Sequence, residues 1–159
     1  MTPKKKKILK IGAILLIAGL LIGGGTIFYM FNMPHRNVQS ASSDFKLTAS
    51  QLVAEYLDDR TKANEKYLAD DGDSKILEIT GIVKKFSGDF SGQKVVLLQG
   101  ESDKAGVSCS FTKETSKNVS SIQIGKTVSI KGVIRSGATY DEDLEMYENV
   151  ILEKVDLVK

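Results

Sequence analysis

The stretch GVSCSFTKETSKNVSSIQIGKTVSIKGVIRS at residues 106–136 decides the fold, because its hydrophobic pattern changes twice along its length. Apolar and hydroxyl side chains alternate over residues 106–112, which predicts a strand with one buried face. The following residues, 113–124, place two apolar side chains three apart and so predict a short helix. A second alternating run over residues 127–135 predicts another strand. Strand, short helix and strand therefore follow one another here.

Outside this stretch, the same alternation predicts three more strands. Two of them, at residues 75–86 and 93–99, precede it, and the third, at residues 146–158, follows it. In the last strand the apolar side chains change parity near Glu153 and Lys154, so one extra residue should form a β-bulge there. The complete set is five strands.

A long helix is predicted before the first strand. Thr48 and Gln51 form a capping-box pattern, and apolar side chains recur at helical spacing over residues 49–68. Three strands, a short helix and two strands, in this order, are typical of the OB-fold, a five-stranded Greek-key barrel. We therefore predict a mainly β domain over residues 48–159, with a long helix and a five-stranded OB-fold barrel that has a short helix between strands 3 and 4.

The N-terminal segment predicts a membrane anchor. Residues 11–31 carry no charge, and a helix of this length spans about 31 Å, the thickness of a bilayer's hydrocarbon core. Five lysines lie within residues 1–10, so the positive-inside rule places this basic tip in the cytoplasm. Residues 32–47 are polar and predict a flexible linker. The prediction is a single-pass protein of the inner or plasma membrane whose C-terminal domain is extracytoplasmic.

Two questions about this anchor stay open. A cleaved signal peptide is the alternative, but the apolar run exceeds the usual length and no small-x-small cleavage site directly follows it. Gly19 and Gly23 form a small-xxx-small pair through which two helices could pack as a dimer. Glycine is also common in such helices that have no defined partner.

Charge separates the anchor from the domain. Six of the 22 Lys and Arg residues precede Asp44, which leaves 16 against 20 Asp and Glu, a net charge of −4 for the rest of the chain. Proteins bind nucleic acid chiefly by neutralising phosphates with cations. A nucleic-acid partner is therefore not expected.

The sequence offers no catalytic or metal-binding set. Cys109 is the only cysteine and His35 the only histidine, so Cys-based zinc sites and Cys–His catalysis are excluded by count. Cys109 lies on the apolar face of a predicted strand, where a small buried thiol is expected. No nucleophile, base and orienting group can be assembled. We expect a protein that is not an enzyme and that needs no cofactor or metal.

Four short strings carry a resemblance to a known family. They are MPHR at residues 33–36, ITGIV at 79–83, GVSCSF at 106–111 and IGKTVSIKG at 124–132. In this order and spacing, the chain resembles the tRNA anti-like family, bacterial OB-fold domains often found behind an N-terminal membrane segment. The resemblance implies the fold and the anchored arrangement. It implies no activity and no site residues, since one fold hosts many functions.

Aromatic side chains in two loops are candidate ligand contacts. OB-folds bind ligands with the loops that join strands one to two and four to five. Here the first loop bears Phe86 and Phe90, and the second bears Tyr140. Such rings stack on a base, a sugar or an apolar side chain, or else they close the ends of the barrel.

The second loop also carries acidic residues. We take Asp141 and Asp143 as candidate ligand-binding residues, because carboxylates attract a cationic protein surface or, weakly, calcium. A solvated acidic loop is the alternative. Either way, this loop should repel phosphate.

Together these patterns predict a membrane-anchored, extracytoplasmic OB-fold module that recognises a protein or a polar ligand. A protein partner in the cell envelope is expected. Single-stranded nucleic-acid or oligosaccharide binding by the OB-fold is the alternative.

Overall fold

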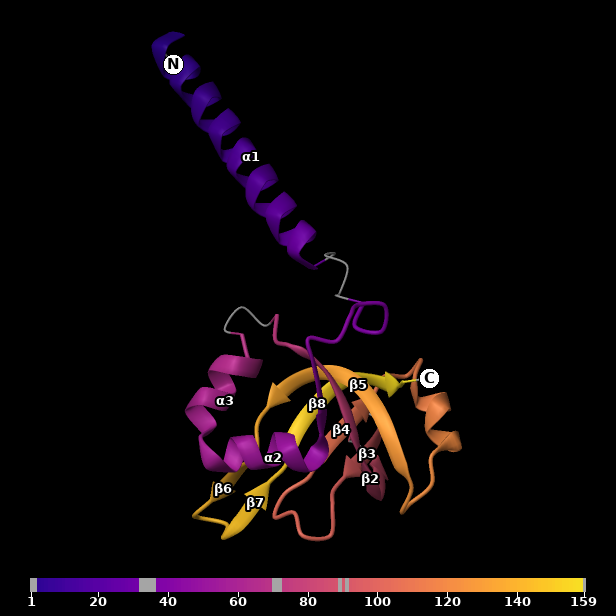
Figure 1. Ribbon diagram of the computed structural model, residues 1–159. Helices are drawn as coiled ribbons and strands as arrows, with labels where there is room; N and C mark the ends of the chain where they lie inside the picture. Colours follow the sequence, from indigo (N-terminus) through magenta and orange to yellow (C-terminus); the bar gives the residue numbers. More distant parts are fainter. Residues whose placement is uncertain (1–2, 32–36, 70–72, 89, 91, 159) are drawn as a thin grey trace. The chain divides into compact units, whose positions relative to one another are not determined.

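The computed structural model describes residues 3–31, 37–69, 73–88, 90 and 92–158 (Figure 1). The chain divides into two compact units, residues 1–36 and 37–159. The MPHR string at residues 33–36 and the first part of the predicted linker lie outside the described residues. Each unit is therefore considered by itself.

The first unit contains one helix, α1 (Pro3–Phe31). Side chains are described from residue 15 to residue 29, and the apolar ones among them are exposed. Among the residues that the structure describes, we find no helix with both the length and the apolar character that a membrane span requires. The spanning segment predicted over residues 11–31 is therefore not confirmed, and neither is the helix dimer through Gly19 and Gly23.

Five strands of the second unit close a barrel, as predicted. They are β2 (Ile76–Gly88), β3 (Lys94–Leu98), β4 (Val107–Phe111), β5 (Thr127–Ser136) and β8 (Val150–Leu157). Around the barrel the order is β2, β3, β4, β8, β5, and β5 pairs again with β2. The β4–β8 pair is parallel and the other barrel pairs are antiparallel. The predicted short helix is η1 (Ser116–Ser121), a 3₁₀ turn between β4 and β5.

The prediction of one long helix over residues 49–68 is wrong, because this segment forms two helices, α2 (Ala49–Asp58) and α3 (Arg60–Tyr67). The capping box of Thr48 is present as predicted, and it starts α2. Asp59 breaks the run because its backbone is extended and its carboxylate accepts a hydrogen bond from the Lys62 amide at 3.1 Å. An aspartate that caps a new helix competes with continuation of the old one.

A further strand, β1 (Phe45–Thr48), pairs in parallel with the start of β2. The sequence prediction placed these residues mostly in the linker, so this strand was missed. Asp44 fixes the start of the pair, since its carboxylate accepts a hydrogen bond from the Ile76 amide at 2.7 Å. Lys131 holds the preceding residues as well, because its ammonium group donates to the carbonyls of Gln39 and Ala41.

The strand predicted over residues 146–158 is also two strands, β7 (Met146–Glu148) and β8. Strand β7 leaves the barrel and forms a two-stranded hairpin with β6 (Thr139–Asp141). The predicted bulge is confirmed, since the β4–β8 register shifts beyond Leu152 and Lys154 has a φ of 52°. The loop between the fourth and fifth barrel strands is therefore an ordered hairpin.

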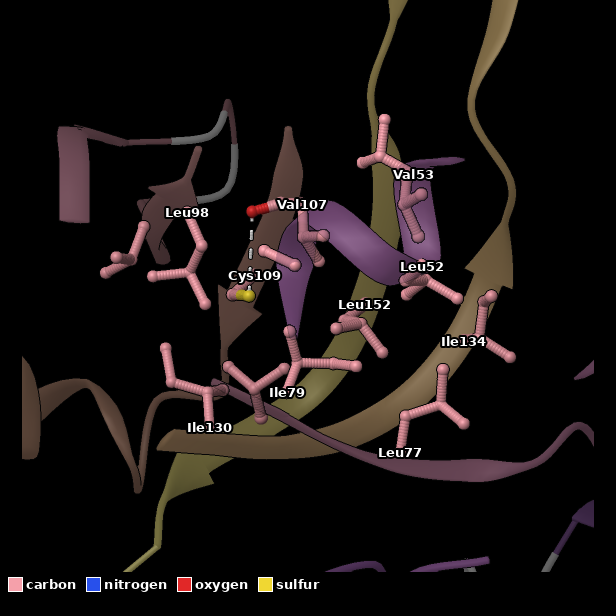
Figure 2. Close-up of a cluster of buried hydrophobic side chains, with 14 of the residues drawn as sticks. Leu52, Val53, Leu77, Ile79, Leu98, Val107, Cys109, Ile130, Ile134 and Leu152 are labelled. Atoms are coloured by element: carbon pink, nitrogen blue, oxygen red, sulfur yellow. Dashed lines mark hydrogen bonds between the residues drawn. The ribbon is translucent and has the colours of Figure 1, made fainter. Parts of the chain in front are cut away.

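The core fills the barrel and continues under α2. Leu52 and Val53 of α2 lie among inward side chains of the strands, as Figure 2 shows. Gln51 and Ala54 on the other side of α2 are exposed, so this helix covers the barrel with one apolar face. Helix α2 thereby comes close to β6 as well as to the barrel.

Cys109 is fully buried in this core, as predicted, and its Sγ lies 3.7 Å from the Val107 carbonyl (Figure 2). Burial raises the pKa of the Cys109 thiol, so it stays protonated and unreactive at neutral pH. We expect a thiol reagent at pH 8 to modify native protein at least about 100-fold more slowly than urea-unfolded protein. Equal rates, followed by mass spectrometry, would contradict this burial.

Candidate ligand-binding pockets

Two pockets lie at the loops that the sequence analysis selected. The first-loop pocket, with a volume of about 460 Å³, lies between the end of β2, the start of β3 and η1. It is lined by Phe86, Ser87, Gly88, Gly92, Gln93, Lys94, Val119, Ser120 and Ile122. Phe86 is half-buried and packs against the core, whereas Phe90 is fully exposed and is not part of the lining. The two candidate phenylalanines are therefore not brought into one site.

The second pocket, here called the hairpin pocket, has a volume of about 400 Å³. It lies where the β6–β7 hairpin meets the α2–α3 junction and the loop between β3 and β4. Its lining consists of Tyr56, Leu57, Arg60, Lys104, Thr139, Tyr140, Glu142 and Tyr147. The candidate residue Tyr140 is thus in a pocket.

Two tyrosines form the aromatic wall of the hairpin pocket. Tyr140 and Tyr147 stand directly opposite each other in the β6–β7 pair, and their ring centroids are 4.8 Å apart. Cross-strand aromatic pairs of this kind stabilise a hairpin. Tyr140 still keeps 46% of its surface exposed, so its ring is available to a ligand.

Two cations lie beside this wall. The Lys104 ammonium lies 5.5 Å from the centroid of the Tyr147 ring, a cation–π distance. The Arg60 guanidinium donates a hydrogen bond of 3.3 Å to the Thr139 hydroxyl. The pocket therefore combines positive charge, hydroxyl groups and aromatic surface.

The acidic candidates are placed differently from Tyr140. The Asp141 carboxylate accepts hydrogen bonds from the amides of Asp143 and Leu144, each at 2.9 Å, so it stabilises the hairpin turn. Neither Asp141 nor Asp143 lines the pocket, whereas Glu142 does. Within the described ranges, no group of three or more His, Cys, Asp or Glu residues is arranged to hold a metal.

Tyr56 forms the buried side of the pocket. Only 2% of the residue is exposed, and its hydroxyl has no hydrogen-bond partner among the described residues. Burial raises the pKa of Tyr56 to about 12, so the hydroxyl remains a donor. A buried hydroxyl without a partner costs about 1–3 kcal/mol and calls for an explanation.

Of the residues that line this pocket, the sequence predicted only Tyr140 as a site residue. The missed residues include Tyr56, Arg60, Lys104 and Tyr147. Tyr56 and Arg60 belong to the predicted helix. Helical spacing placed Tyr56 among the packed apolar residues and Arg60 on the solvent-exposed side. Tyr147 was placed inside a long strand. The one signal that could have found it is the spacing around the Asp141 turn, which would pair Tyr140 with Tyr147 across a hairpin.

The outer face of β3 and β4 is the other surface where OB-folds take ligands. Val95 and Leu97 point outward from β3, opposite Ser110 and Ser108 of β4. These side chains are aliphatic or hydroxylic, and all four are partly buried. These two strands therefore present no aromatic ring on which a base could stack.

Comparison with known proteins agrees with this fold. The model of the tRNA_anti-like family matches residues 1–142. A candidate nucleic acid-binding lipoprotein from Klebsiella pneumoniae is similar with a TM-score of 0.51 and 18% identity, over 70% of this chain and 91% of that chain. The yeast Stn1 and Ten1 structure is more distant, with a TM-score of 0.39 and 16% identity over 77% of this chain and 66% of that one. No curated protein matches.

Proposed function

Because this chain belongs to the tRNA_anti-like family, we propose that it is a membrane-anchored OB-fold module that binds a protein or polar ligand outside the cytoplasm. The hairpin pocket is the observation that carries the proposal. A concave pocket of about 400 Å³ in which aromatic rings lie beside convergent polar and charged groups can hold and orient a small ligand. It also lies at the loop between the fourth and fifth barrel strands, which OB-folds commonly use.

The anchored location is supported by the charge pattern of the first unit. Five lysines precede a run of 21 residues without a charge, and that run lies within α1. This asymmetry favours an N-terminus in the cytoplasm and the domain on the other side of the membrane. In intact cells, a membrane-impermeant maleimide should label a Ser120→Cys variant, because Ser120 is exposed on η1. Labelling only after cell lysis would refute the extracytoplasmic placement.

Partner capture in the native membrane tests the binding function. A photocrosslinking amino acid at position 140 places the reactive group in the hairpin pocket, and one at position 90 places it in the first loop. Glu65, which is exposed on α3 and lines neither pocket, is the matched control position. We expect a discrete adduct from position 140 that is absent at position 65. Equal adduct patterns at all three positions would contradict a specific site.

Single-stranded nucleic-acid binding is the second candidate function. It is favoured by the paired tyrosines with adjacent cations, since stacking and positive charge together are how OB-folds hold single strands. The net charge of −4 after the anchor and the aliphatic outer face of β3 and β4 count against it. Titration of a labelled oligonucleotide at low salt decides the matter. Micromolar binding that weakens steeply with salt would favour this function over the first.

A further inference from the structure

The charges of the hairpin pocket identify the ligand that it fits. We infer that it binds a single carboxylate group carried on a flat or apolar body, with Arg60 and Lys104 holding the carboxylate and Tyr140 and Tyr147 contacting the body. This inference rests on the binding function proposed above and gives its ligand class.

Arg60 and Lys104 lack a salt-bridge partner among the described residues, unlike two lysines on the helix that carries Arg60. Lys62 pairs with Asp59 at 3.0 Å, and Lys66 pairs with Glu55 at 2.8 Å. Across the residues that the structure describes, neither Arg60 nor Lys104 forms an ion pair. The planar Arg60 guanidinium matches a carboxylate in geometry, and the Lys104 ammonium, from the same pocket lining, adds a second positive charge.

The tyrosine pair defines the other half of the ligand. The rings of Tyr140 and Tyr147 are tilted by 54° to each other, and Leu57 adds an aliphatic side chain to the lining. A sugar ring, an aromatic side chain or a short aliphatic chain would contact this wall. A small ion that lacks such a ring or chain would leave this wall exposed to solvent.

The surrounding acids limit the ligand to one negative charge. Glu142 is part of the lining, and Asp143, Glu145 and Glu148 are exposed on the same hairpin. Repulsion from these carboxylates grows with each negative charge on the ligand. A chain of phosphates would therefore be repelled more strongly than a ligand with a single carboxylate.

Tyr56 adds an unpartnered hydrogen-bond donor to the residues that line this pocket. It is a donor without a partner, buried beside the same pocket. Replacement of a buried unsatisfied hydroxyl by hydrogen relieves its desolvation cost. A bound carboxylate within hydrogen-bond distance would satisfy the hydroxyl instead.

The probes for the test are N-acetylphenylalanine and its amide, which differ only in the charged carboxylate, and glucuronate as an acidic sugar. Full-length protein in detergent is titrated with each probe and binding is measured by calorimetry. We expect at least one of the acids to bind with a Kd of about 10 mM or lower. The amide should bind at least about tenfold more weakly than its acid. Arg60→Gln and Lys104→Gln should each weaken acid binding about tenfold, while Lys62→Gln should leave it unchanged. Which acid binds better distinguishes a peptide source from a sugar source.

Several results would overturn the inference. Equal binding of N-acetylphenylalanine and its amide, no binding of either acid, or tighter binding of an oligonucleotide would each do so. These results leave the crosslinking test from position 140 untouched, so failure of the ligand class is distinguishable from failure of the binding function.

The Tyr56→Phe variant tests the hydroxyl separately. We expect its urea midpoint to be equal to or higher than that of the parent, and its affinity for the acid to fall about three- to tenfold. If the hydroxyl has no role in binding, the affinity will be unchanged whatever the midpoint. That pattern would remove Tyr56 from the site.

Discussion

Phe111→Ala is expected to lower the free energy of unfolding by about 3–5 kcal/mol, the usual cost of emptying a phenylalanine site in a core. Phe111 is completely buried at the end of β4, and it faces Val155 just past the bulge in β8. The cavity would lie among side chains of a closed barrel, which cannot collapse without breaking strand pairs. Such a loss is a large part of the about 5–15 kcal/mol that stabilises a typical domain.

The matched control is Phe90→Ala, because Phe90 is fully exposed. Removal of an exposed ring should change the free energy of unfolding by less than about 0.5 kcal/mol. Urea unfolding followed by circular dichroism at strand wavelengths measures both variants. Similar midpoints for the two variants would mean that Phe111 is not part of the core.

The positions of the barrel strands along the chain could largely be predicted from the sequence, because alternation is a local property. The residues around Val107 and Ile130 show their buried face in the sequence itself, and both lie in the core. The secondary-structure predictions were wrong where a helix cap or a tertiary contact overrode the local pattern. Asp59 looked like a polar position on a helix and instead caps a second helix. Strand β1 is only four residues long and exists because it pairs with β2.

The pocket could be predicted only in part, for a related reason. Tyr140 was found because its loop is a general ligand-binding loop of the fold. Arg60 and Lys104 come from segments 44 residues apart along the chain, and no local pattern connects them. Their approach depends on α2 lying across the barrel, which is a property of tertiary packing.

Gly137→Ala is expected to be the most damaging small substitution, with a loss of about 3 kcal/mol or more in the free energy of unfolding. Gly137 connects β5 to β6, and its backbone lies directly against the Tyr56 ring. A methyl group there would fall 1.9 Å from one ring carbon and 2.0 Å from the next. Tyr56 is only 2% exposed, so displacement of its ring would disturb the side chains packed around it.

Gly88→Ala is the matched control, since a methyl group at Gly88 would meet only the Gln93 carbonyl oxygen at 3.8 Å, an ordinary contact. It should change stability by less than about 0.5 kcal/mol. Urea midpoints of both variants measure the contrast.

The cause of the Gly137 effect can be isolated with a smaller side chain at position 56. If the clash with the Tyr56 ring is the cause, Gly137→Ala should cost much less in a Tyr56→Leu background than in the parent chain, by more than about 1 kcal/mol. An unchanged cost would place the strain in the backbone of the β5–β6 connection. The contact between Gly137 and Tyr56 also joins α2 to the segment that leads into the hairpin. Gly137→Ala should therefore weaken acid binding in the hairpin pocket as well. Phe111→Ala, a substitution within the barrel core, should affect stability alone.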